Sequence, residues 1–263
     1  MLTLKNSLIK NLPDSLYVRL KNLQGIFRGT SERYLSIDGK IRVSDRELFW
    51  TTHRNRCHLY SGGFTHRGRS IGKSYLLNNI AFNNRDVVID CGANMGDLQL
   101  FFWDLGIDIT YIGIEPNPTD FECLSENKLG SASFLNLALW NEKGCLKFWV
   151  DSMSASSSLI EPPGYTEIIR VDTVRLDQLS LPSRIKLLKI EGEGAEPEIL
   201  LGCSGILHKV EFISADVGPE RGVDQTSTRN DVVDYLLEKN FEIIEENRYH
   251  RKTILFVNKT LIC

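Results

Sequence analysis

Apolar and polar positions alternate in two distinct ways along the chain from residue 87 onward. Short apolar runs, such as Val87-Val88-Ile89, are typical of buried strands, whereas longer amphipathic stretches are typical of helices. The regular alternation of the two predicts an α/β fold with a mostly parallel sheet and helices on both faces. The predicted strands are 87–90, 110–115, 132–138, 145–150, 167–171, 185–191, 210–217, 241–246 and 253–257, and the predicted helices are 95–104, 118–128, 195–202 and 229–239.

The last two predicted strands, 241–246 and 253–257, follow one another without an intervening helix. A connection this short favours a hairpin, which would add an antiparallel strand to an otherwise parallel sheet. Residues 151–165 are serine-rich and then continue with Pro162-Pro163-Gly164, so we predict a mobile loop there.

The first 80 residues follow a different pattern. Apolar residues recur at helical spacing over residues 1–30 with basic residues between them and Pro13 as an interruption, so we expect one or two short amphipathic helices. Asp38-Gly39 lies between two alternating segments and predicts a β-hairpin. We predict a further helix at 74–81. The chain is therefore divided into a basic helical and hairpin appendage, 1–80, and a main domain, 81–263.

Composition places the chain among ordinary globular proteins. Its 263 residues are 42% hydrophobic and 25% charged. No apolar run reaches the roughly 18 residues of a membrane span, and the first residues lack the pattern of a secretory signal, so we expect a cytoplasmic protein. The six cysteines form no Cys-x-x-Cys pair, which favours reduced thiols over a structural zinc site.

Charge is distributed unevenly along the chain. Residues 1–85 carry 15 Lys and Arg against 5 Asp and Glu, a net charge of +10, whereas the remaining residues carry a net charge of −13. A basic segment of this kind suits an anionic partner, and it suits equally well a set of ion pairs with the acidic main domain. The N-terminal helix is open to two interpretations in the same way, as a membrane-surface helix or as a helix packed on the main domain.

The predicted strand 87–90 runs straight into a glycine turn, Asp90-Cys-Gly-Ala-Asn-Met-Gly96. Gly92 and Gly96 allow the backbone to turn tightly beneath a ligand. The spacing differs from the G-x-G-x-x-G of dinucleotide sites, in which a pyrophosphate lies on a helix N-terminus. Asp90 suits the ammonium and sulfonium charges of S-adenosylmethionine better than phosphates. With Ala93 and Asn94, the turn is therefore predicted to bind S-adenosylmethionine.

A second acid follows the next predicted strand. Strand 110–115 ends in Glu115, which Pro116 follows. A carboxylate at this position can accept hydrogen bonds from both ribose hydroxyls of an adenosine-bearing cofactor. The glycine turn and Glu115 together predict a cofactor site.

Four segments of the chain resemble the FkbM-type methyltransferases: 90–96, Glu115-Pro116, Ala138-Leu139 followed by Gly144, and 188–196. The resemblance covers about residues 60–257. It implies a class I methyltransferase (Rossmann-like) fold with a seven-stranded, mostly parallel sheet whose last strand is antiparallel, behind a small N-terminal α/β appendage. It also implies S-adenosylmethionine as methyl donor, a cofactor site that includes Ala138 and Leu139, and O-methylation of a sugar or natural product. One position departs from the family pattern, because Glu191 stands where Asp is usual.

The reacting groups are expected at the end of the strand 185–191. Lys189, Glu191 and Glu193 alternate, so an extended strand would place all three on one face, and Asp216 ends the next strand. Methyl transfer needs a group that takes the proton of the hydroxyl. The carboxylates could do so directly or hold a divalent metal, and Lys189 could hold a substrate oxygen. The alternative is that Lys189 and Glu193 form a structural ion pair.

The acceptor is less well defined than the cofactor. A basic cluster, Arg56, His58, Arg67 and Arg69, could bind a phosphate or carboxylate of an anionic sugar or glycan acceptor, or belong to a solvated loop. The alternative function is an RNA or other nucleic-acid methyltransferase that uses the basic N-terminal region. An NAD-dependent oxidoreductase is disfavoured by the glycine spacing, and a non-catalytic scaffold by the intact turn. Metal dependence and oligomeric state stay open at this point.

Overall fold

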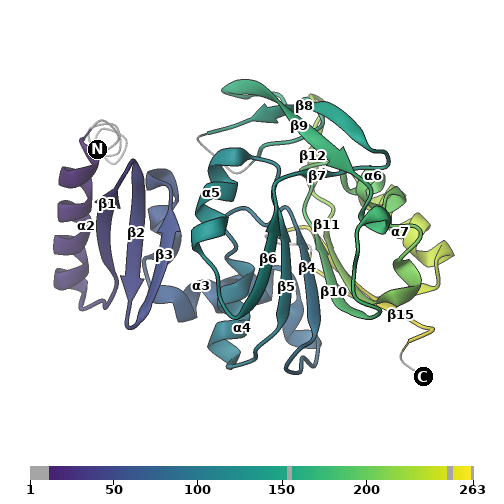
Figure 1. Cartoon of the computed structure of the whole chain (residues 1–263), viewed down its shortest axis with the longest axis horizontal. Coiled ribbons are helices and arrows are strands. Elements are labelled where there is room, and N and C mark those ends of the chain that lie inside the picture. Colours follow the sequence, from purple (N-terminus) through teal and green to yellow (C-terminus); the bar gives the residue numbers. More distant parts are fainter. Residues whose placement is uncertain (1–11, 153–155, 248–250, 262–263) are drawn as a thin grey trace.

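A seven-stranded sheet forms the centre of the molecule in the computed structural model, which describes residues 12–152, 156–247 and 251–261 (Figure 1). Its strands lie in the order β14-β15-β11-β10-β4-β5-β6. They are β4 (Val87–Cys91), β5 (Thr110–Ile114), β6 (Ser131–Leu135), β10 (Ile185–Ile190), β11 (Val210–Asp216), β14 (Phe241–Glu246) and β15 (Thr253–Asn258).

The strands from β11 to β6 are parallel, and β15 is antiparallel to both of its neighbours. Chain order reverses at β4, since β5 follows on one side and β10 returns on the other. This confirms the predicted α/β fold, the class I methyltransferase fold, and the predicted C-terminal hairpin. In such open sheets, ligands bind at the carboxyl ends of the strands where the order reverses.

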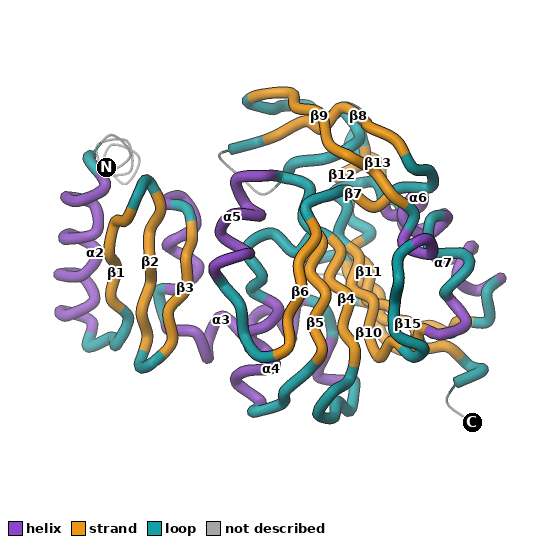
Figure 2. The backbone as a smooth tube through the Cα atoms, viewed as in Figure 1, coloured by secondary structure: helices purple, strands orange, loops and turns teal. Residues whose placement is uncertain are grey.

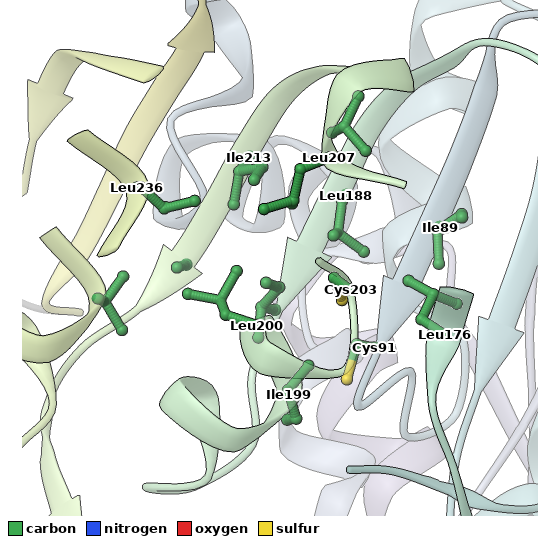
Figure 3. Close-up of a cluster of buried hydrophobic side chains, with 14 of the residues drawn as sticks. Ile89, Cys91, Leu176, Leu188, Ile199, Leu200, Cys203, Leu207, Ile213 and Leu236 are labelled. Carbon is green, nitrogen blue, oxygen red and sulfur yellow. The ribbon is translucent and has the colours of Figure 1, made fainter. Parts of the chain in front are cut away.

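Helices cover both faces of this sheet because alternate strand residues point to opposite sides. One face packs Ile89, Leu188 and Ile213 against helices α6 (Glu196–Leu201) and α7 (Arg229–Glu238), as Figure 3 shows around Leu200 and Leu236. The other face packs against α4 (Leu98–Leu105). Helix α5 (Pro118–Glu126) begins with an N-cap, since Asn117 Oδ1 accepts the Thr119 amide at 3.1 Å.

Helix α4 begins three residues later than the pattern predicted. The delay has a backbone cause, because Asn94 (φ +49°) and Gly96 (φ +83°) are left-handed and cannot belong to a helix. The predicted strand 132–138 is also divided in the structure. It splits into β6 and β7 (Ala138–Leu139) at Asn136, whose side chain donates to the Glu115 carbonyl at 2.9 Å.

Two of the predicted strands lie outside the central sheet. Strands β8 (Gly144–Val150) and β9 (Glu167–Val174) join β7 in a small sheet of order β7-β9-β8, drawn above the central sheet in Figure 2. A short hairpin, β12 (Pro219–Arg221) and β13 (Thr226–Ser227), follows β11.

The N-terminal segment forms a helix and an antiparallel meander. Helix α2 (Asp14–Arg28) is followed by β1 (Arg33–Ile37), β2 (Lys40–Asp45) and β3 (Leu48–Thr52). The hairpin at Asp38-Gly39 is confirmed, because β1 and β2 pair up to Ile37 and Lys40. The part of the predicted N-terminal helices that falls within residues 1–11 lies outside the described residues.

The predicted helix at 74–81 is wrong. After η1 (Arg54–Tyr60), helix α3 (Gly63–Ser74) ends where that helix was expected to begin, and only the short η2 (Leu77–Asn79) follows. Helix α3 packs against α4 through Gly68 and Gly72, beside the buried Phe64, and a side chain at Gly68 would lie 2.4 Å from the Leu100 carbonyl oxygen. With glycines at two of its contact positions, the helix has too few apolar residues to show a clear helical periodicity.

Part of the basic excess of the N-terminal segment is neutralised within the fold. Lys40 Nζ lies 2.9 Å from Glu126 and 3.2 Å from Glu122, both on α5, and Arg67 lies 2.6 Å from Asp97 of the main domain. The interpretation of the charge asymmetry as pairing with the acidic main domain therefore accounts for several of these side chains. No helix within the described ranges is long and apolar enough to cross a membrane.

Candidate active site

A pocket opens at the carboxyl ends of β4, β5 and β10, at the reversal of strand order. It brings together the predicted cofactor residues and most of the predicted reacting groups. Neither Asp216 nor Gly96 lines it. The predicted site residues that line the pocket are Asp90, Gly92, Ala93, Asn94, Glu115, Pro116, Ala138, Leu139, Lys189, Glu191 and Glu193.

The glycine turn is locked against the end of β10. Gly92 has φ +71°, and a side chain there would meet the Glu191 carbonyl oxygen at 2.1 Å. The Glu191 amide in turn donates to the Cys91 carbonyl at 3.2 Å. Glycine at position 92 is thus required both by conformation and by this close approach.

Glu115 is buried, and it supports the turn from the side of β5. Its two carboxylate oxygens accept the backbone amides of Asn94 and Asn117, each at 2.8 Å. Burial, and then repulsion by Asp120, raises the pKa of Glu115 to about 8. Each oxygen keeps a second lone pair, which is what a ribose hydroxyl would need.

Lys189 is buried and its ammonium group is surrounded by protein oxygens. The Nζ atom lies 2.9 Å from Asp90 Oδ1 and 3.1 Å from Glu191 Oε2. It also donates to the backbone carbonyls of Cys91 at 3.1 Å and Gly92 at 2.8 Å. Burial, the largest single effect, would lower the pKa of Lys189, but the charge of Asp90, its hydrogen bond and the neighbouring Tyr75 together more than offset it and the pKa is raised. The lysine therefore stays charged and holds the turn in place.

The partner of Glu191 and Asp216 was missed by sequence reasoning. Arg251, from the β14–β15 connection, forms an ion pair with Glu191 and lies 3.0 Å from Asp216. Tyr75, which follows α3, donates its hydroxyl to Glu191 and accepts from Arg251 at 2.8 Å. No signal in the sequence links these positions, because the side chains come from opposite ends of the chain. Glu191 and Asp216 are thereby committed to protein partners.

Glu193 is placed differently from Glu191. Strand β10 ends at Ile190 and Glu193 has a left-handed φ of +50°, so the expected alternation along one strand face does not extend this far. The Glu193 carboxylate lines the pocket and makes no hydrogen bond or ion pair with any residue that the structure describes. The postulated ion pair with Lys189 is absent among the same residues. Burial, followed by repulsion from Glu220, Asp216 and Glu196, raises the pKa of Glu193 to about 9.

Asp97 joins the N-terminal segment to the turn, and it too was missed by sequence reasoning. It precedes α4 and its Oδ1 accepts from the Trp50 indole at 2.9 Å and from the Tyr60 hydroxyl at 2.7 Å. Arg67 on α3 lies 2.6 Å from its Oδ2. A carboxylate therefore occupies the helix N-terminus on which a dinucleotide's pyrophosphate would lie.

The pocket has a roof made of separate chain segments. Phe148 of β8 lines it together with Ser157 and Leu159. The rim is closed by η1, where the Asn55 amide donates to the Ser152 carbonyl at 2.7 Å. Ser158 reaches the floor by donating to the Glu193 carbonyl at 2.8 Å.

The other predicted candidates divide in two groups. Arg56 and Arg67 line the pocket, whereas His58 and Arg69 do not, and Arg69 is paired with Asp104 at 2.8 Å. No group of three or more His, Cys, Asp or Glu side chains arranged to hold a metal ion occurs within residues 12–152, 156–247 and 251–261.

Comparison with known proteins gives one family match. Residues 90–243 match the model of the methyltransferase FkbM domain. No curated protein sequence matches the chain.

Several solved structures are similar to the chain at low sequence identity. A methyltransferase FkbM from Methylobacillus flagellatus is 16% identical over 68% of this chain, with a TM-score of 0.49, and the chain spans 45% of its length. A putative RNA methyltransferase from Pyrococcus horikoshii is 14% identical over 77% of this chain and 85% of its own, with a TM-score of 0.41. TrmK from M. capricolum, in complex with S-adenosyl-homocysteine, is 12% identical over 72% and 68%, with a TM-score of 0.42.

Proposed function

The chain belongs to the FkbM methyltransferase family, and from that premise we propose that it binds S-adenosylmethionine in the pocket and transfers its methyl group to a hydroxyl of a sugar or glycan. Family membership supports the methyl transfer. The acceptor class rests on the likeness of the motifs in segments 90–96, 115–116, 138–144 and 188–196 to that family.

The charges of the pocket fit this cofactor. Six carboxylates line the pocket, and three of its four cations, Arg67, Lys189 and Arg251, are already paired with protein carboxylates. A ligand that carries ammonium and sulfonium cations stabilises the ionised forms of these acids, including Glu115 and Glu193 with their raised pKa values, whereas a pyrophosphate opposes their ionisation. Both oxygens of Asp90 are bound by the protein, since Oδ1 lies 2.9 Å from Lys189 Nζ and Oδ2 accepts the Tyr111 hydroxyl at 2.6 Å. Asp90 therefore acts on the cofactor site through Lys189.

The observation that carries the proposal is the unpaired carboxylate of Glu193. The bound cofactor supplies an electrophilic methyl group and a neutral thioether leaving group. The acceptor oxygen forms its bond to carbon as the carbon–sulfur bond breaks, and the hydroxyl proton must pass to a base. Glu191 is committed to Tyr75, Lys189 and Arg251, so Glu193 is the base we propose.

The raised pKa of Glu193 has a predictable effect on the rate. Only the deprotonated carboxylate can accept a proton, so kcat/KM should rise with pH toward the pKa of about 9 in the free enzyme. Glu193→Gln should bind S-adenosylmethionine normally and lose methyl transfer by about 10²–10⁴-fold. Calorimetry and radiolabelled methyl transfer over a panel of sugars and glycans measure the two properties.

Glu220→Gln is the matched control. Glu220 contributes to the raised pKa of Glu193 but does not line the pocket. The control should keep its activity and move the rising limb of the pH profile to lower pH. A Glu193→Gln enzyme with wild-type turnover would refute the role of Glu193.

Two further measurements separate the proposal from its alternatives. Titration with NAD in place of S-adenosylmethionine should give no binding, because a pyrophosphate would meet the Asp97 carboxylate before α4. An RNA arm of the methyl-transfer screen tests the nucleic-acid alternative, which the basic N-terminal region suggests. Label incorporated into RNA and into none of the sugars would overturn the proposed acceptor class.

A further inference from the structure

The four cations of the pocket differ in whether a carboxylate of the protein pairs with them. Arg67, Lys189 and Arg251 are each held by carboxylates of the protein. The Arg56 side chain lines the same pocket and makes no hydrogen bond or ion pair with any residue in the described part of the chain. It is therefore the one pocket cation, among the described residues, with an uncommitted charge.

Other arginines of the N-terminal segment do have carboxylate partners. Arg54 lies 2.9 Å from Asp14, and Arg69 lies 2.8 Å from Asp104. The pocket acids that this segment contacts are also occupied, since Asp97 accepts from Tyr60 and Asp120 pairs with His53. No described carboxylate thus pairs with Arg56.

The backbone beneath Arg56 is firmly placed. Cys57 and Tyr60, both within η1, are fully buried, and the Arg56 amide donates to the His53 carbonyl at 3.0 Å. Asn55 ties the same turn to the roof through Ser152. Because the backbone is already ordered, anion binding by Arg56 costs only the ordering of its side chain, and a guanidinium suits an anion well.

We propose that Arg56 binds a carboxylate or phosphate group of a ligand in the pocket. The proposal rests on the proposed function, and the anion has two chemical sources. One is the amino-acid carboxylate of S-adenosylmethionine. The other is an acidic group on the acceptor, which would then be a uronic acid or a sugar phosphate. A guanidinium matches both groups with two parallel hydrogen bonds.

Arg56→Gln tests the proposal, with Arg69→Gln as control, because Arg69 carries the same charge in the same segment but does not line the pocket. Calorimetry is performed with S-adenosylmethionine and with methylthioadenosine, which lacks the carboxylate. If the cofactor is the source, Arg56→Gln should weaken S-adenosylmethionine binding about 10–100-fold and leave methylthioadenosine binding unchanged.

If the acceptor is the source, cofactor binding stays unchanged. Binding of glucuronate or glucose 1-phosphate to the protein saturated with S-adenosyl-homocysteine should then be lost in Arg56→Gln and retained in Arg69→Gln. Equal behaviour of Arg56→Gln and the wild type with all four probes overturns the proposal. Failure of the wild type itself to bind S-adenosylmethionine would instead contradict the proposed function.

A second observation concerns the outer face of α2. Leu16, Leu20, Leu23 and Phe27 recur at intervals of four and three residues and are 42%, 38%, 50% and 88% exposed. At 100° per residue they form one stripe, directly opposite the side of the helix that carries the buried Val18 and Gly25. Figure 1 shows α2 at the end of the molecule farthest from α7.

We infer that this stripe, Leu16, Leu20, Leu23 and Phe27, docks on an anionic lipid surface. The exposed cations of the helix are Arg19 and Arg28, whereas Lys21 faces the fold and donates to the Ser61 hydroxyl at 2.8 Å, and the one acid, Asp14, is paired with Arg54. Pairing with a second copy would bring these cations together, whereas anionic headgroups would attract them while the stripe enters the interface.

Sedimentation with vesicles measures this binding. The wild type should sediment with phosphatidylglycerol vesicles at low salt, less at high salt, and hardly at all with phosphatidylcholine. Phe27→Glu should reduce sedimentation several-fold, whereas Leu237→Glu on α7, an equally nonpolar-to-acidic change at an exposed site, should not. Wild-type sedimentation of Phe27→Glu, or a dimer in light scattering that Phe27→Glu dissolves without any vesicle binding, overturns the inference.

Discussion

At the scale of single residues, Lys189 is a charged side chain that positions its neighbours and takes no direct part in the reaction. Its ammonium group contacts two carboxylates and two backbone carbonyls, and none of its donors is left for a substrate. The prediction that it holds a substrate oxygen is replaced by a positioning role. The glycine turn of the pocket and the end of β10 are joined through this one side chain.

Removal of Lys189 should therefore be costly. Lys189→Met leaves Asp90 and Glu191 without their shared counter-ion, and an unpaired buried carboxylate destabilises a fold by about 3–5 kcal/mol. Urea denaturation measures the loss, and the double variant with Asp90→Asn should recover part of it. An unchanged unfolding midpoint would show that water, rather than Lys189, compensates these carboxylates.

At the scale of elements, helix α3 determines where the N-terminal segment meets the main domain. It crosses α4 at Gly68 and Gly72, and the side chain it presents to the turn is Arg67, bound to Asp97. Close approach of the two helices is possible because neither glycine has a Cβ atom. The distance between α3 and α4 therefore also sets the position of Arg67.

A methyl group at Gly68 should separate the two helices. Gly68→Ala would place its Cβ 2.4 Å from the Leu100 carbonyl oxygen, which is backbone and cannot rotate away. Alanine normally stabilises a helix by about 1 kcal/mol relative to glycine, so a loss of about 1–3 kcal/mol would have the opposite sign. Thermal denaturation measures it. Gly164→Ala, in open space, is the control, and equal midpoints for both variants would contradict close packing at α3.

What could be predicted from the sequence follows from the range of the interactions. The central strands and the glycine turn are encoded by local apolar runs and by residues that are adjacent in the chain, and these predictions are confirmed. Helix α3 was missed because two of its contact positions, Gly68 and Gly72, are glycine rather than a large apolar residue. Arg251 and Asp97 were missed because their partners lie far away in sequence, so only the folded chain brings them together.

At the scale of the whole molecule, the acidic groups around the pocket are under mutual repulsion. Burial is the largest cause of the raised pKa of each group, and repulsion by neighbouring acids adds to it. The pKa is raised to about 8 for Glu115, about 9 for Glu193, about 6 for Asp216 and about 7 for Glu220. Each group is more easily ionised in the unfolded chain than in the fold. Their ionisation therefore opposes folding.

The ligand-free protein should lose stability as pH rises. Because these pKa values are raised in the folded state, the acids stabilise the fold in their protonated form. This contribution is complete below the unfolded pKa of about 4.5 and is lost as pH rises through about 6 to 9. Melting temperatures across this window should fall for the wild type and fall less for Glu193→Gln. S-adenosylmethionine, as a cation, should flatten the curve, and a melting temperature that rises with pH would exclude this repulsion.

The contact between Gly92 and the Glu191 carbonyl has a mechanical consequence. Since the turn after β4 and the end of β10 share this contact, an amide hydrogen bond and the Lys189 ammonium, neither can shift without the other. The floor of the pocket is thus a single rigid body. We therefore expect this floor to keep its position when an acceptor binds.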